Sequence, residues 1–446
     1  MSDWQIYLTL ATIAVVVFVI AFDLIDMAVA TLLGVVVMLV TGILDESDFL
    51  KVQGTAGGVV ALLFGGMVVA RVLETSGVFA TLGVPFLHLT RGSGRRFLLL
   101  IVPTVAVICA FLPNAATVVL IAPLIIRAAQ ALGIGYVGPM ILVAIVSNAA
   151  GLLTLVGDPA TYLVGTAMGM TFPQYIRQVS LGGLLSVLVI VPLLPLLMRD
   201  VWNTRRELPP AGPMPRLQRP VFVALALGVL ALMVLLFLFG QQLPTDIGPP
   251  AAAILGATLA LLAVQGLRVE PVSETLRAVD WKTLIFLGAI MSLMQALEKT
   301  GVIQGMSLRL ADWLGSEYTL VALTLLAAVG LMSTVLANIP VVAASIVMTK
   351  GYFVAIEAVP EIALSGQFTE WPVAALPVFI AMMFGGTLGG NATLIGASAN
   401  VVAVGICAAN GRRVTFMQFL RIGLPIAVVQ LSIGALYVWA LHSMLG

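Results

Sequence analysis

The sequence predicts an all-α polytopic membrane protein made of two inverted repeats, and three observations lead to this fold class. First, 61% of the 446 residues are hydrophobic and 9% are charged, whereas a soluble domain carries roughly 25% charged residues. Second, many apolar runs approach the ~20 residues that are needed to cross a hydrocarbon core. Third, short motifs of the first half recur in the same order in the second half. The composition therefore excludes a cytosolic enzyme, a secreted disulfide scaffold and a disordered chain.

The apolar segments of the first half divide into spans, one interfacial helix and two interrupted regions. Phe97–Arg127 is interrupted by Pro113-Asn114, which predicts a re-entrant hairpin. Val137–Gly169 is too long for one span and is interrupted at Gly157-Asp158-Pro159, which predicts a broken helix. Thr75–Leu89 is short and mixed, which predicts an interfacial helix. The uninterrupted spans are Gln5–Phe22, Met27–Leu44, Ala56–Leu73 and Leu181–Leu197.

The second half repeats the first at four separate places. RVLETSGV, with Glu74 and Gly77, matches QALEKTGV, with Glu298 and Gly301. The other three pairs are Asn114 with Asn338, Gly34 with Gly256, and TLVGDPA at Thr154–Ala160 with TLIGASA at Thr393–Ala399. Four matches in one order indicate an internal duplication, so each half should hold five transmembrane helices, including a broken helix, and a re-entrant hairpin.

An odd number of spans in each half inverts the second copy relative to the first. Under this topology most of the 21 Lys and Arg residues fall on one face, including Arg91, Arg205 and Arg412. By the positive-inside rule this face is cytoplasmic, and both termini lie outside. Met1–Trp4 lacks Lys and Arg, so we expect no signal peptide. The expected location is a bacterial inner membrane.

Backbone polar groups cannot remain unpaired in lipid, so the interrupted segments must be buried in protein or line a cavity. Helix ends at such breaks supply amide donors and carbonyl acceptors for a solute. Polar side chains collect at the same places in both halves, although a lone membrane Asn or Thr more often joins helices. The candidate solute-binding residues are Asn114, Asn148, Thr154, Asn338, Asn391, Thr393, Ser398 and Asn400.

Asp158 is the one acidic residue expected at membrane depth, where a charge costs about 2.5–3.5 kcal/mol on insertion scales. One interpretation is a coupling site for a proton or a sodium ion. The other is an N-cap, because Asp158 precedes Pro159 and could accept amides of the following half-helix. Its partner in the second half is Ala397, so the repeat encodes no second carboxylate.

The remaining reactive residues indicate neither a metal site nor a catalytic one. His88 and His442 are far apart, and the two cysteines lack zinc or disulfide spacing, although Cys109 could act as a soft ligand. A membrane aspartyl protease needs two facing carboxylates and a serine protease needs a paired base, and the sequence predicts neither. A net charge of +1 gives no reason to expect a nucleic-acid partner. No nucleotide-binding loop is present, so we expect no cofactor and no primary pump.

The stretches SNAAGLLTLVGDPATYLVG and GGNATLIGASANVVAVGICAANG resemble the ion transporter superfamily, which contains arsenite-efflux permeases, sodium/proton antiporters, the melanosomal P protein, and citrate and divalent-anion symporters. The resemblance is strongest to the P-protein and arsenite-permease branch and covers nearly the whole chain. It implies a homodimer in the lipid bilayer, in which a transport domain moves as an elevator against a scaffold. The implied divisions are a first repeat at 1–198 (scaffold helices 5–89, transport part 97–198), a cytoplasmic linker at 199–220, and a second repeat at 221–446 (scaffold helices 221–316, transport part 320–446).

The substrate prediction depends on where the chain departs from this family. Members of the antiporter and P-protein branch tend to carry Asp before both tip asparagines, where this chain has Pro113 and Ala337. Their absence argues against sodium/proton antiport, and an anion would meet no Lys or Arg at membrane depth. A small neutral hydroxy solute suits Asn, Thr and Ser, so the sequence favours efflux of arsenite or antimonite coupled to protons. A citrate or dicarboxylate carrier, a sodium/proton antiporter and a channel are the alternatives.

Overall fold

The computed structural model describes residues 3–21, 24–208, 219–364 and 368–445. It consists of two halves in which the helices follow one another in the same order. Within the described residues there is no β-strand, and a single backbone bridge joins Ser93 to Arg205. Nine of the described helices are long and apolar enough to cross a membrane, or ten if a bent pair counts as one span. The expected all-α polytopic fold is therefore confirmed.

The first half begins with four helices that match the helical segments predicted between residues 5 and 89, and it continues with the interrupted regions around Pro113 and Asp158. Its helices are α1 (Asp3–Ala21), α2 (Met27–Val40), α3 (Glu46–Thr75), α4 (Val78–Thr90), α5 (Gly94–Cys109), α6 (Asn114–Ala131), α7 (Val137–Ala150), η1 (Gly151–Leu153), α8 (Pro159–Ala167), α9 (Phe172–Gln178), α10 (Ser180–Leu188), η2 (Val191–Leu193), α11 (Leu194–Leu197) and α12 (Arg199–Trp202).

The second half follows the same order with a longer loop before its broken helix. Its helices are α13 (Pro220–Phe239), η3 (Gly240–Gln242), α14 (Pro249–Gly266), α15 (Val272–Arg277), α16 (Trp281–Lys299), α17 (Val302–Leu314), α18 (Tyr318–Ser333), α19 (Asn338–Ala355), η4 (Glu361–Leu364), η5 (Val373–Ala375), α20 (Leu376–Gly389), η6 (Gly390–Ala392), α21 (Ser398–Ala409) and α22 (Phe416–Leu445).

Equivalent residues make equivalent local structures in the two halves. Gly77 between α3 and α4 has φ 74°, and Gly301 between α16 and α17 has φ 78°. Both values lie in the left-handed region that glycine adopts without strain, which explains the recurrence of glycine at the bend. The hairpin breaks also recur, since α5 and α6 meet at Pro113 and α18 and α19 meet at Ala337. The inverted relation between the halves stays a prediction.

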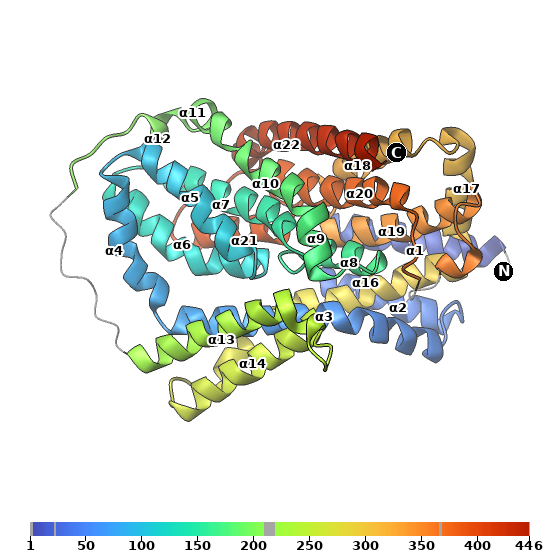
Figure 1. Cartoon of the computed structure of the whole chain (residues 1–446), viewed down its shortest axis with the longest axis horizontal. Coiled ribbons are helices and arrows are strands. Elements are labelled where there is room, and N and C mark those ends of the chain that lie inside the picture. Colours follow the sequence, from blue (N-terminus) through green and yellow to red (C-terminus); the bar gives the residue numbers. More distant parts are fainter. Residues whose placement is uncertain (1–2, 22–23, 209–218, 365–367, 446) are drawn as a thin grey trace.

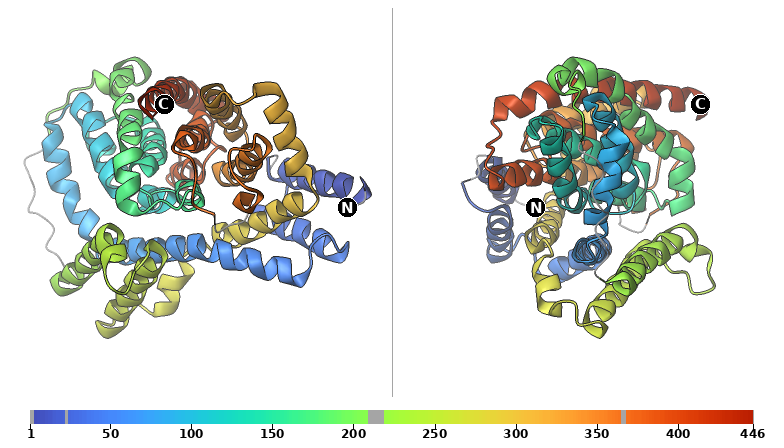
Figure 2. Two further views of the ribbon diagram at one scale, coloured as in Figure 1. Left: turned by 45° about the vertical axis from the view of Figure 1, so that its right-hand side comes forward. Right: turned by 90° about the vertical axis from the view of Figure 1, so that its left-hand side faces the viewer.

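Helices α3, α13 and α14 form a layer along one side of the molecule, and the hairpins and broken helices lie on the other side (Figures 1 and 2). The two halves contact each other extensively, because α3 packs against α14 and α16 packs against α2. Ion pairs reinforce this contact: Lys282 of α16 reaches Asp26 at 2.6 Å, and Lys299 reaches Asp45 at 3.1 Å and also Asp48. In Figure 1 the start of α1 and α17 lie at one end of the molecule, and α12 and the α4–α5 junction lie at the other.

The span expected at Leu181–Leu197 corresponds to Ser180–Leu197, which is long and apolar enough to cross a membrane. It runs through α10, η2 and α11, and Pro192 and Pro195 stand in the two short helices. The predicted linker 199–220 is not wholly a connector, because α12 packs against α5. Residues 209–218 of that linker lie outside the described part of the chain.

Candidate functional site

Asp158 lies where the broken helix of the first half meets both hairpin tips. Its side chain is 2% exposed. One carboxylate oxygen, Oδ2, accepts the backbone N–H of Ala160 at 2.9 Å and so caps α8. The other oxygen, Oδ1, accepts the Nδ2 amides of Asn114 at 2.7 Å and Asn338 at 3.4 Å. Oδ2 thus caps a half-helix, as one of the two interpretations predicts, and Oδ1 faces the hairpin tips, while the coupling role stays a prediction.

The Asp158 carboxylate has no cationic partner in the described part of the chain, where every ion pair involves other residues. A buried carboxylate without a countercharge is unfavourable in a low-dielectric interior. Amide donors from Asn114 and Asn338 offset part of this penalty. A proton or a small cation would offset more of it, so the arrangement suits a titrating or cation-binding group.

Four of the predicted asparagines form one continuous hydrogen-bonded chain across the halves. Asn114 Nδ2 donates to Asn148 Oδ1 at 3.3 Å. Asn148 Nδ2 in turn donates to Asn391 Oδ1 at 2.9 Å and Asn400 Oδ1 at 3.0 Å. Asn400 Nδ2 donates to the carbonyls of Gly390 and Thr393, each at 2.8 Å. Asn148, Asn391 and Asn400 are 0% exposed. Asn148 therefore bonds to both Asn391 and Asn400, and these bonds join the broken helices of the two halves. Asn114 and Asn338 are the asparagines that contact Asp158.

The hydrogen-bonded network continues to Gln430, a residue that was not predicted from the sequence. Asn391 Nδ2 donates to Gln430 Oε1 at 2.8 Å, and Gln430 Nε2 donates to the Ser186 carbonyl at 2.8 Å. Gln430 is fully buried within α22. The sequence does indicate a special role for Gln430, because it is the only amide or charged residue between Arg421 and His442. Such a side chain in an apolar span is expected to face a polar partner.

Thr154 and Thr393 occupy equivalent places but act on the backbone. The Thr154 hydroxyl donates to the Ala110 carbonyl, and the Thr393 hydroxyl donates to the Thr334 carbonyl. Both acceptors lie at the end of the first helix of a hairpin, where carbonyls lack helical partners. Each threonine therefore ties a broken helix to its own hairpin. The structure does not bring Ser398 into this network, since its side chain is exposed at the start of α21.

Close backbone approach at the first break depends on Gly151. A Cβ at this position would lie 2.8 Å from Asp158 Cβ and 3.1 Å from Asn114 Oδ1. A Cβ at the equivalent Gly390 would lie 2.8 Å from the Gly396 carbonyl oxygen. Both distances are shorter than real side-chain contacts allow, so a glycine is required beside each break.

Cys109 supports the tip of the first hairpin. Its thiol lies 2.9 Å from the Ser147 carbonyl oxygen and 3.2 Å from Asn114 Oδ1. The thiol thus contacts the amide oxygen of Asn114, while the amide nitrogen of the same side chain donates to Asp158. No group of three or more His, Cys, Asp or Glu side chains that could hold a metal ion occurs among the described residues.

A cavity of about 870 Å³ lies between α3 and α16 on one side and α8 and α19 on the other. It is lined by Tyr162 of α8 and Ala343 of α19, and by Gly58 of α3 and Met294 of α16. Helices α8 and α19 begin at Pro159 and Asn338 and pack against each other. The cavity therefore follows the two helices whose first residues adjoin the carboxylate.

Three charged residues, Lys51, Glu298 and Lys350, also line this cavity. Lys350 is 6% exposed, lies within the membrane-length helix Asn338–Ala355, and has its ammonium 5.8 Å from the ring centre of Trp371. Lys350 stands five residues before the end of this helix, so the expectation that no Lys or Arg lies at membrane depth stays a prediction. The Lys350 charge interacts with that of Glu298 on α16, which lines the same cavity together with Lys51.

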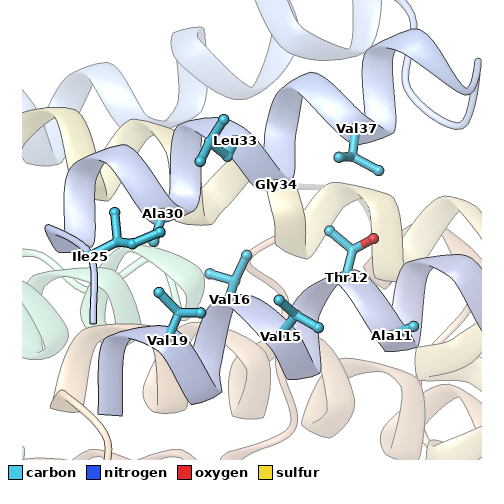
Figure 3. A pocket seen from close by; sticks show the side chains of 10 residues that line it. All are labelled: Ala11, Thr12, Val15, Val16, Val19, Ile25, Ala30, Leu33, Gly34 and Val37. Carbon is cyan, nitrogen blue, oxygen red and sulfur yellow. The ribbon is translucent and has the colours of Figure 1, made fainter. Parts of the chain in front are cut away.

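A second hollow, of about 300 Å³, lies between α1 and α2 (Figure 3). Its lining consists of aliphatic side chains such as Val16 and Leu33, with the hydroxyl of Thr12 as the polar exception (Figure 3). Such a lining supplies no set of hydrogen-bonding groups for a polar solute. The candidate site is therefore the Asp158 region and not this groove.

Comparison with known proteins gives one family and several relatives along the whole chain. A family model described as "Citrate transporter" matches residues 15–365. An uncharacterised transporter of Synechocystis is 39% identical over 433 residues, which cover 97% of this chain and 96% of that protein. The P protein of Homo sapiens is 26% identical over 527 residues, which cover 100% of this chain and 61% of the P protein.

The solved structures add a likeness of fold. The crystal structure of the YdaH transporter of Alcanivorax borkumensis aligns with a TM-score of 0.55 and 13% identity over 87% of each chain. At this identity the likeness concerns the fold alone. The family model and the sequence relatives confirm the resemblance to the ion transporter superfamily.

Proposed function

This chain is a membrane transporter that belongs to the citrate transporter family, and we propose that it exports a trivalent metalloid oxyacid, arsenite or antimonite, in exchange for protons. The observation that carries the proposal is the buried Asp158 carboxylate, which is bonded to two hairpin-tip amides and has no cationic partner among the described residues. Transport, rather than catalysis, is the role of this site.

The chemistry of the site favours a neutral solute over an anion. Arsenous acid is uncharged near neutral pH and carries hydroxyl groups that both donate and accept hydrogen bonds. Asn114 and Asn338 can offer amide groups to such a solute. An anion at the same place would be repelled by ionised Asp158, because charges interact strongly where water is excluded.

Proton coupling follows if solute and proton compete for Asp158. In the ionised state Oδ1 accepts hydrogen bonds from Asn114 and Asn338, or from the hydroxyls of a bound solute. When a proton binds, the carboxyl group loses acceptor capacity and its attraction for the solute falls. A proton that enters from outside would therefore release the solute there and would be lost again inside the cell.

The proposed movement is an elevator displacement of the transport parts, 97–198 and 320–446, against the scaffold helices of 5–89 and 221–316. The cavity between these sets of helices supports this proposal, because α3 and α16 line one side of it and α8 and α19 the other. Ion pairs between Lys282 and Asp26 and between Lys299 and Asp45 join the scaffold of the two halves. We further propose a homodimer in a bacterial inner membrane, with both termini outside.

Transport in proteoliposomes tests the proposal. Purified protein is reconstituted, labelled arsenite or antimonite is loaded inside, and an acidic outer buffer supplies the proton gradient. We expect efflux that the gradient accelerates and that protonophore treatment slows. Counterflow of label against unlabelled solute should also occur, whereas a channel would give none. Absence of arsenite and antimonite flux under all gradients would contradict the proposed substrate.

A second candidate is a carboxylate carrier of the citrate or dicarboxylate type, and one observation favours it. Lys350 and Lys51 line the cavity beside the site and would attract an anion. A thermal-shift screen against arsenite, antimonite, sodium and citrate separates the candidates, since a ligand of the folded state raises the apparent stability. Stabilisation by citrate together with sodium, and not by arsenite, would establish the second candidate. Stabilisation by sodium alone would indicate a sodium/proton antiporter.

A further inference from the structure

A pocket lined by arginine side chains lies at the junction of α4 and α5, away from the Asp158 region. Its volume is about 420 Å³, and four arginine residues line it. They are Arg91, Arg96, Arg205 and Arg206. The first two flank the start of α5, and the other two follow α12. Chain segments that are distant in sequence thus place like charges around one hollow.

The backbone holds these two segments together. Arg206 N donates to the Gly92 carbonyl at 2.9 Å, and Gly94 N donates to the Thr204 carbonyl at 2.9 Å. Gly92 has φ 72°, and a Cβ there would lie 1.8 Å from the Arg206 carbonyl oxygen. A side chain at Gly92 would therefore be incompatible with this contact. The pocket is a product of a specific fit between the α4–α5 turn and the segment after α12.

The Arg206 side chain is also placed by a third segment. A Cβ on Gly133, in the loop between α6 and α7, would lie 2.0 Å from a guanidinium nitrogen of Arg206. The loop backbone thus makes room for this side chain. Contact with both the α4–α5 turn and the α6–α7 loop restricts where the Arg206 charge can lie.

Positive charge in the pocket exceeds negative charge. Glu207 is the one carboxylate that lines it, and none of the four arginines forms an ion pair with a described residue. The adjoining residues 209–218 contain neither Asp nor Glu. Four like charges around one hollow repel one another, and the partial positive charge at the start of α5 adds to this. A bound anion would relieve that repulsion.

We propose that this pocket binds the phosphate group of an anionic phospholipid. Planar guanidinium groups donate two parallel hydrogen bonds to phosphate oxygens, which makes arginine the preferred residue for such groups. Apolar surface for the acyl chains adjoins the pocket, since Leu208 lines it and Leu89, two residues before Arg91, is 62% exposed. The inference is independent of the substrate proposed for the Asp158 region.

Binding of phosphatidylglycerol to the full purified chain tests the inference. The double variant Arg96→Gln/Arg205→Gln removes two of the pocket charges and leaves the backbone contacts of Gly92 and Gly94 in place. The control Arg412→Gln/Arg413→Gln removes two exposed arginines between α21 and α22. Native mass spectrometry in detergent with added phosphatidylglycerol gives the apparent affinity, and a melting temperature for each variant verifies folding.

We expect the pocket variant to bind phosphatidylglycerol roughly tenfold more weakly, because charge-assisted hydrogen bonds are lost. The control variant should bind as the unchanged protein does, and phosphatidylcholine should bind weakly to all three. Equal affinity of the folded pocket variant and the unchanged protein would overturn the inference. Inorganic phosphate is the second arm, and competition by phosphate at concentrations similar to those of the lipid would overturn the assignment to a phospholipid.

Discussion

The side-chain amide of Asn338 lies 3.4 Å from the carboxylate of Asp158, measured from Nδ2 to Oδ1. This contact joins the hairpin tip of the second half to the broken helix of the first. Asn114, the equivalent tip residue of the first half, reaches the same oxygen at 2.7 Å. Two repeated residues therefore converge on one carboxylate that has no repeated counterpart, since Ala397 stands in its place. The hairpin-tip asparagines therefore occur in both halves, whereas the carboxylate that they contact occurs in the first half alone.

Asp158→Asn should remove the dependence of transport on the pH gradient and leave the fold intact. Asparagine caps helices as well as aspartate does, so the bond from Ala160 N to the side chain can remain. The group that binds the proton is lost. Flux with and without a pH gradient measures the effect. Asp246→Asn, at an exposed loop residue with φ 44°, is the matched control, and an unchanged gradient dependence in Asp158→Asn would reduce Asp158 to a cap.

Asn148→Ala and Asn338→Ala should separate stability from binding. The first change leaves the buried acceptors of Asn391 and Asn400 without their donor, and each unsatisfied group costs about 1–3 kcal/mol. The second removes one hydrogen bond of 3.4 Å. We expect a lower melting temperature for Asn148→Ala, and weaker solute binding with near-normal melting for Asn338→Ala. The reverse pattern would place the solute at Asn148 instead.

Gly151→Ala should abolish or strongly reduce transport. The added methyl group would lie 2.8 Å from Asp158 Cβ, so the carboxylate or the α7–α8 break must move. Gly138→Ala in α7 is the control, because no atom lies within 4 Å of the corresponding Cβ. Solute flux and melting temperature of both variants provide the measurement. Full flux in Gly151→Ala would show that the position of Asp158 is not critical.

Thr154→Val and Thr393→Val should each lower stability by about 1 kcal/mol, the net contribution of a typical hydrogen bond. Each substitution removes the hydroxyl that ties a broken helix to a hairpin carbonyl. Thr→Ser at either position keeps the hydroxyl and should restore most of the stability. Unfolding in detergent with added denaturant gives the comparison. If the serine variants are as unstable as the valine variants, packing and not hydrogen bonding explains the loss.

Lys299→Gln should destabilise the protein at neutral pH and have less effect in acid. Hydrogen bonds from the Ser47 hydroxyl, the Asp48 amide and the Lys299 ammonium hold the pKa of Asp45 well below its ordinary value of 3.8. A carboxyl whose pKa is lower in the folded state contributes its stability above the unfolded pKa and loses it as pH falls through the folded pKa. Melting temperatures at pH 7 and pH 3, with Arg412→Gln as control, test this. A difference of equal size at both pH values would contradict it.

Much of the architecture could be predicted because proline, glycine and apolar run length are local signals. The breaks at Pro113-Asn114 and Gly157–Pro159 lie where they were expected. Hydrogen-bond partners could not be predicted, since the choice among several buried amides depends on distances between helices. The partners of Gln430 could not be predicted for this reason, although its isolation in an apolar span was visible, and Ser398 lies outside the network although it stands beside the second break. The burial of Lys350 likewise depends on how α19 packs against neighbouring helices.

The sequence by itself determined the membrane class, the duplicated order of helices and the residues at the four breaks, because composition, run length and helix-breaking residues act over short distances. Only the tertiary structure decided which asparagines hold the broken helices together and which face Asp158. It also decided that the carboxylate uses Oδ2 to cap α8 and Oδ1 to contact Asn114 and Asn338. Directional hydrogen bonds extend over about 3 Å, so their partners are set when distant segments pack together and not by their order in the chain.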